Sequence, residues 1–188
     1  MTTFALIHGA TSAGFYWDRV IPRLIDAGHT VVAPDLPAGD PDADFMAYAD
    51  AVDAALEKVP RFAEDLVVVG QSMGGFTAPV VASRHPGAWI VLVAPMIPQP
   101  GETPGEYFHH VDLETAQRDA AKKGGYDPSF DVQRIFLHDV APEVIEQLMA
   151  RGEPEQAETI FAQPFPVDEW PDAPTRVIAC TDDRTPSV

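Results

Sequence analysis

The chain has 188 residues, of which 46% are hydrophobic and 22% charged, a composition typical of one globular domain with a sizeable core. No apolar run approaches the ~18 residues that span a membrane, so we expect no membrane partner. The formal net charge of −17 disfavours nucleic acid, because the two fields repel each other. The single cysteine, Cys180, excludes an internal disulfide and favours a cytoplasmic protein in which Cys180 is a small buried core residue.

The first 95 residues alternate short apolar runs with helical patterns. Strands are predicted at Phe4–Ile7, Thr30–Ala33, Leu66–Val69 and Trp89–Val93. Helices are predicted at Trp17–Ile25, at Phe45–Val59 and from Phe76 to just before His85, with Pro79 expected to kink or weaken the third helix. The strands are continuously apolar rather than alternating, which indicates a mostly parallel sheet with helices on both faces. The expected fold class is therefore α/β.

The chain changes character between residue 96 and about residue 174. Prolines recur there, and short amphipathic stretches at Leu113–Lys123, Asp131–Leu137 and Pro142–Ala150 favour helices. Arg176–Cys180 then resumes the strand pattern. We expect a core part at residues 1–95, an inserted helical, Pro-rich cap at residues 96–174, and a core strand with an acidic turn at residues 175–188. A doubly wound sheet continues with another helix and strand, so we expect the core to extend beyond the end of this chain.

A Gly-x-Ser-x-Gly pentapeptide occupies residues 70–74, between a predicted strand and a predicted helix. Glycines on either side of Ser72 allow the sharp turn that presents a serine hydroxyl, which makes Ser72 the candidate nucleophile. The first strand ends at His8-Gly9-Ala10. The backbone N–H groups of Ala10 and Met73 are the candidate donors of an oxyanion hole, and we expect His8 to hold this loop in place.

The orienting acid of a catalytic serine belongs at the carboxyl end of a strand, where the loops of a parallel sheet converge. Asp182 and Asp183 follow the last predicted strand and are the candidates. We favour Asp183 and keep Asp182 as the alternative.

Taken in order, these motifs resemble the α/β-hydrolase superfamily, and more narrowly its capped branch that includes plant-type methyl esterases and hydroxynitrile lyases. The resemblance rests on His8-Gly9-Ala10, Gly14, Trp17, Gly28-His29, Pro34-Asp35-Leu36-Pro37, Gly70-Gln71-Ser72-Met73-Gly74-Gly75 and Asp182-Asp183-Arg184. It implies a Ser-Asp-His mechanism with Ser72 and Asp183, an oxyanion hole at Ala10 and Met73, and a helical cap over the pocket. It also implies a small ester-like substrate and no cofactor.

The chain departs from that family at two places. The family has a proline four residues after its acid. Counted from Asp183 that position is Ser187, whereas Pro186 lies one residue earlier, so Asp182 remains the alternative acid. The family's histidine follows the acid by a few dozen residues, whereas no histidine lies beyond Asp183 here. We expect that histidine in further sequence, and we expect the 188-residue chain by itself to be nearly inactive.

Earlier histidines offer weaker alternatives for the base. His29 and His85 are predicted to lie far from the serine turn, and the remaining candidates are in the cap: His109, His110 and His138. The sequence His109-His110-x-Asp112 is expected to be a solvated loop, and we expect no metal site. Two other functions stay open, a lyase that uses the same pocket and a non-catalytic ligand-binding relative. The sequence leaves the oligomeric state open.

Overall fold

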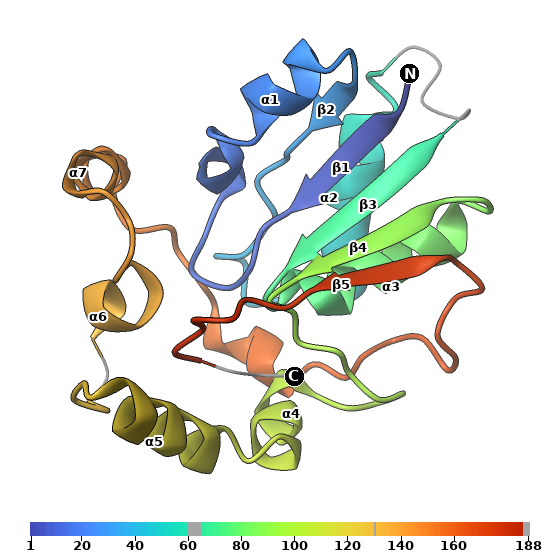
Figure 1. The fold of residues 1–188 in the computed structure, drawn as a ribbon. Coiled ribbons are helices and arrows are strands. Elements are labelled where there is room, and N and C mark those ends of the chain that lie inside the picture. Colours follow the sequence, from blue (N-terminus) through green and yellow to red (C-terminus); the bar gives the residue numbers. More distant parts are fainter. Residues whose placement is uncertain (60–64, 130, 186–188) are drawn as a thin grey trace.

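A computed structural model of the chain describes residues 1–59, 65–129 and 131–185. Five strands form a single parallel sheet in the order β2-β1-β3-β4-β5 (Figure 1). They are β1 (Thr3–Ile7), β2 (Thr30–Val32), β3 (Leu66–Gln71), β4 (Trp89–Val93) and β5 (Thr175–Ile178). The predicted α/β fold with a mostly parallel sheet is confirmed.

Helices cover both faces of the sheet. Successive strand residues point to opposite sides, and both sets of side chains are apolar, so each face needs a covering layer. Ala5 and Ile7 of β1 join the larger core, which α2 (Phe45–Leu56) and α3 (Gly74–Arg84) cover. Leu6 joins the smaller core on the other face, beside the 3-10 helix η1 (Gly14–Trp17) and α1 (Ile21–Asp26). The segment predicted as one helix at Trp17–Ile25 forms parts of two short helices instead. Pro22 lies in the first turn of α1, where a proline is favoured at the start of a helix.

Helix α3 runs unbroken through Pro79, although proline removes one backbone hydrogen bond. Every residue of this helix from Gly74 to Ala82 is buried. Packing against the sheet and α2 outweighs the local cost of the proline, as tertiary contacts usually do for a helix.

Within the described residues, four helices and a 3-10 helix lie between β4 and β5 in the chain and gather on the side toward which the strands point (Figure 1). They are α4 (Pro104–His110), α5 (Leu113–Gly124), α6 (Val132–Phe136), α7 (Pro142–Ala150) and η3 (Glu158–Ala162). The three helices predicted in this segment are found. The domain boundaries at residues 95 and 174 stay a prediction.

Helix α4 was not predicted, and His109-His110 belongs to its last turn rather than to a solvated loop. The sequence nevertheless contains a signal for the start of this helix. Thr103 accepts a hydrogen bond from the Glu106 N–H while the Glu106 carboxylate accepts one from the Thr103 N–H, and Pro104 follows the cap. This capping box starts a helix in a proline-rich stretch whose composition otherwise predicts a loop.

Strand β5 lies at the edge of the sheet and is poorly covered. Val177 and Ile178 are 47% and 52% exposed. The prediction that Cys180 is buried is wrong, because the strand ends at Ile178 and Cys180 is exposed beyond it. Among the described residues, no helix has the length and apolar character to cross a membrane.

Candidate active site

Ser72 lies in a sharp turn between β3 and α3. Its φ angle is +53°, a left-handed conformation that costs free energy in any residue other than glycine. Small neighbours make the turn possible. A Cβ atom would come 2.5 Å from the Gly74 carbonyl oxygen if placed on Gly70, and 2.0 Å from the Met96 carbonyl oxygen if placed on Gly75. Strain of this kind persists only where the surroundings enforce it, and it gathers at functional sites.

The turn is also fixed to the end of β4. The Ser72 N–H donates to the Val93 carbonyl oxygen at 3.1 Å, and the Ser72 carbonyl oxygen accepts from the Met96 N–H at 3.0 Å. Both bonds involve only backbone atoms, so they leave the serine hydroxyl free. The Ser72 residue is half-buried at the carboxyl edge of the sheet.

The loop after β1 lies directly against Ser72. A Cβ atom on Gly9 would be 2.9 Å from the Ser72 Cβ, and the Gly9 N–H donates to Oε1 of Gln71 at 3.1 Å. In the part of the chain that the structure describes, the N–H groups of Ala10 and Met73 donate no hydrogen bond. The two predicted oxyanion donors therefore have no hydrogen-bond acceptor within the described residues.

His8 holds this loop, as predicted, and its side chain is almost fully buried. The Leu36 N–H donates to Nε2 at 3.2 Å, which requires Nδ1 to carry the proton that it donates to the Gly9 carbonyl oxygen at 2.8 Å. Burial lowers the pKa of His8, although the Gly9 contact and Asp35 act against this effect. His8 is therefore neutral with both ring nitrogens engaged, and it is not available as a general base.

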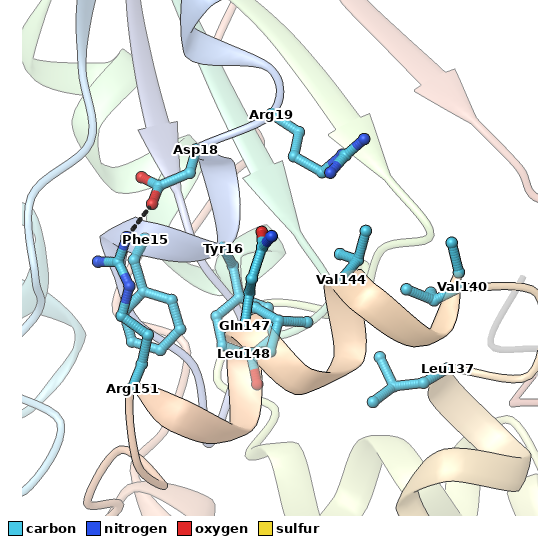
Figure 2. Close-up of a pocket in the computed structure, with 11 residues that line it drawn as sticks. Phe15, Tyr16, Asp18, Arg19, Leu137, Val140, Val144, Gln147, Leu148 and Arg151 are labelled. Atoms are coloured by element: carbon cyan, nitrogen blue, oxygen red, sulfur yellow. Dashed lines mark hydrogen bonds and ion pairs between the residues drawn. The ribbon is translucent and has the colours of Figure 1, made fainter.

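Two cavities lie between the N-terminal part of the core and the segment that follows β4, and the smaller one borders the loop after β1. The larger, of about 450 Å³, is mostly apolar (Figure 2), and its lining includes Phe15, Tyr16, Leu137, Val144 and Leu148. The smaller, of about 380 Å³, includes His8, Ser12, Asp35 and Glu155 in its lining. Arg151 lines both cavities and pairs with Asp18 at 2.6 Å, next to the Phe15 ring. Ser72 does not line either cavity.

The predicted acidic turn follows β5. The Asp183 carboxylate accepts a hydrogen bond from the Thr185 N–H at 2.8 Å, and the residue is partly buried. Asp182 has an 85% exposed side chain whose Oδ2 is 3.6 Å from Nε2 of His138. Pro186 and Ser187, which bear on the choice between the two acids, lie outside the described residues. No contact in the described structure joins either carboxylate to Ser72.

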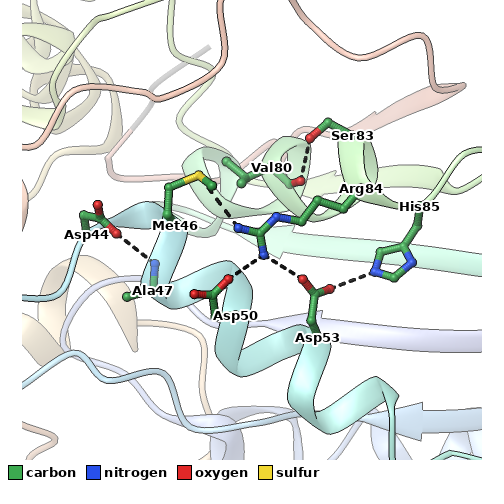
Figure 3. A network of polar contacts seen from close by, with 9 residues as sticks. All are labelled: Asp44, Met46, Ala47, Asp50, Asp53, Val80, Ser83, Arg84 and His85. Atoms are coloured by element: carbon green, nitrogen blue, oxygen red, sulfur yellow. Dashed lines mark hydrogen bonds and ion pairs between the residues drawn. The ribbon is translucent and has the colours of Figure 1, made fainter.

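Three of the other histidines contact residues away from Ser72. His85 contacts Asp53 at 2.7 Å, and Asp53 also accepts from Arg84 at 2.6 Å, in a network that joins α2 to α3 (Figure 3). His110 contacts Glu102 at 3.0 Å, and His29 packs edge-on against Phe4. Among the described residues, no histidine hydrogen-bonds to Ser72. The structure therefore places Ser72, the predicted nucleophile, against the predicted oxyanion loop, which is the loop that follows β1 and contains Ala10. Among the described residues, the base stays unassigned.

The chain is similar in sequence to known proteins. The sequence matches the alpha/beta hydrolase family over residues 4–188. It is 29% identical to methylesterase 7 of Arabidopsis thaliana over 123 residues, which cover 61% of this chain and 47% of that protein. It is 32% identical to the (S)-hydroxynitrile lyase of Manihot esculenta over 89 residues, 44% of this chain and 34% of the relative.

The fold is also similar to a solved structure. An extracellular alpha/beta-hydrolase from a Paenibacillus species superposes with a TM-score of 0.73 at 19% identity, over 97% of this chain and 78% of that one. The matched segments span less than half the length of the two curated relatives above. The predicted resemblance to methyl esterases and hydroxynitrile lyases is confirmed.

Proposed function

We propose that this chain, which belongs to the alpha/beta hydrolase family, acts in a hydrolase of small carboxylic esters with Ser72 as its nucleophile. The left-handed turn at Ser72 carries the proposal, because a turn of this kind presents a serine hydroxyl. It is supported by the loop after β1, which lies against Ser72, and by the N–H groups of Ala10 and Met73, which donate no hydrogen bond within the described residues. The methylesterase relative supports an ester substrate. A cytoplasmic location, favoured by the single cysteine, stays a prediction.

The reaction in this proposal begins when a histidine takes the proton of Ser72 and the hydroxyl oxygen attacks the ester carbonyl. The Ala10 and Met73 N–H groups stabilise the negative oxygen, a contribution that typically amounts to about 10²–10³ in kcat per donor. The alcohol then leaves with the proton from the histidine, and water hydrolyses the acyl-serine to release the acid. Asp183 orients the histidine in this proposal, in the chain order of the family.

Labelling of the full-length protein with a fluorophosphonate probe tests the nucleophile. We expect labelling of the wild type and none of Ser72→Ala. Ser83→Ala is a matched control, because Ser83 lies on α3 and its hydroxyl donates only to the Val80 carbonyl oxygen. An unlabelled wild-type protein that is folded would overturn the proposal.

The second candidate is a lyase on the same site, favoured by the hydroxynitrile lyase relative. Assays of a panel of esters against a panel of cyanohydrins separate the two reactions, since a lyase releases cyanide and an aldehyde or ketone. The third, a ligand-binding relative without catalysis, predicts saturable binding of such compounds with no turnover of either panel.

A further inference from the structure

Three successive peptide groups after β1 are each held by a different side chain. Gln71 accepts from the Gly9 N–H, and His8 donates to the Gly9 carbonyl oxygen. Because the N–H of a trans peptide points opposite to its carbonyl group, the His8 contact also sets the direction of the Ala10 N–H. The third peptide group, between Ala10 and Thr11, is held by Gln156, whose Oε1 accepts from the Thr11 N–H at 3.2 Å.

Gln156 comes from a part of the chain far from the other two side chains. It lies between α7 and η3, 145 residues after Thr11. Thr11 has a φ angle of +49°, which is unfavourable for a β-branched residue, and its backbone therefore needs support from its surroundings. Among the described residues, Gln156 supplies the hydrogen-bond acceptor for the Thr11 N–H.

The amide of Gln156 is itself held in one orientation. Its Nε2 donates to the Ala38 carbonyl oxygen and to the Tyr48 hydroxyl group, each at 3.2 Å. The neighbouring Ala157 N–H also donates to the Ala38 carbonyl oxygen, at 2.7 Å. Tyr48 is only 2% exposed in α2, so the partner group is rigid. With both ends of the amide engaged, Oε1 can only face Thr11.

We propose that Gln156 is a positioning residue for the oxyanion hole. It fixes the Ala10–Thr11 peptide group, which adjoins the Gly9–Ala10 peptide group that carries the Ala10 N–H. Fixing the one group limits movement of the other, and this keeps the Ala10 N–H aimed at the substrate oxygen. This proposal rests on the proposed function of Ser72. The hole then depends on the hydrogen bonds of Gln156 itself, whose neighbouring residues Glu153 and Glu155 line the smaller cavity together with Ser12.

Steady-state ester hydrolysis by the full-length protein tests this inference. Gln156→Ala is expected to lower kcat about 10–100-fold with KM unchanged, because small misplacements of a catalytic group have effects of that order. Gln156→Glu keeps an oxygen for the Thr11 N–H, and we expect it to retain more kcat than Gln156→Ala. Gln156→Met keeps the side-chain volume without either hydrogen-bonding group, and it replaces the alanine variant if that variant does not fold.

Thr159→Val is the matched control. Thr159 fastens the same segment to the core through a 2.8 Å hydrogen bond to the Pro41 carbonyl oxygen, without contact to the oxyanion loop. We expect its kcat to equal that of the wild type. An unchanged kcat in Gln156→Ala or Gln156→Met would overturn the inference, as would an equal loss in Thr159→Val. Failure of the proposed function is distinguishable, because the wild type would then not be labelled by the fluorophosphonate probe.

Discussion

The serine turn and the acidic turn lie at the carboxyl ends of strands in the same sheet, but they are built in different ways. Ser72 contacts the loop after β1, the end of β4 and the start of α3, and the glycines around it have no room for a side chain. Asp182 and Asp183 follow an exposed edge strand and are held mainly by local contacts. The position of Ser72 is therefore decided by close packing, whereas Asp182 and Asp183 follow a strand that has little packing of its own.

The choice between the two acids gives the largest expected effect. In the full-length protein, Asp183→Asn is expected to lower kcat by about 10⁴, the effect typical of an orienting acid, with little change in Tm. Asp182→Asn should leave kcat close to the wild-type value, because its side chain is mostly exposed. The reverse result would assign the acid to Asp182.

Gly75→Ala tests the packing of the serine turn. The new Cβ atom would lie 2.0 Å from the Met96 carbonyl oxygen, so we expect a loss of about 3 kcal/mol in the free energy of unfolding, measured in urea. Gly87→Ala is the control, because its Cβ atom would meet nothing within 4 Å and only the φ of +91° opposes it. The control should lose about 1–2 kcal/mol. Equal losses would show that packing is not what constrains Gly75.

The pH dependence of the free energy of unfolding, compared between the wild type and His8→Gln, tests whether a neutral His8 supports the oxyanion loop. Burial lowers the pKa of the folded-state His8 below 6.5, so the unfolded chain binds the proton more readily. The stability that His8 contributes is thus fully present above about pH 6.5 and is lost as the pH falls toward the folded-state pKa. Urea unfolding at several pH values should show this slope in the wild type and a flatter one in the variant. Parallel slopes would contradict a neutral, buried His8.

Val177→Thr tests the exposed edge and has the smallest expected effect. Val177 is 47% exposed in β5, so we expect a change within about 0.5 kcal/mol in the free energy of unfolding. The matched change Val68→Thr, at a fully buried position of β3, should cost about 1–3 kcal/mol, because it buries a hydroxyl group. A large loss at Val177 in the full-length protein would mean that this side of β5 is covered there.

Much of the fold was predictable because its signals are local. Continuous apolar runs marked four of the strands, and the order of glycines around Ser72 marked the turn. Where prediction was wrong, a tertiary contact or a short motif was decisive. Cys180 follows a strand pattern, yet nothing in the described structure covers it. Helix α4 is set by the capping box of Thr103 and Glu106 within a proline-rich stretch.

The sequence by itself determined the α/β class, the parallel sheet and the position of Ser72, since apolar periodicity and glycine spacing act over a few neighbouring residues. Tertiary structure decided that Gly9 lies against Ser72, that His8 is neutral, and that Gln156 reaches Thr11 from 145 residues away. Those facts depend on how distant segments pack, and hydrogen bonds between such segments leave no periodic trace in the sequence.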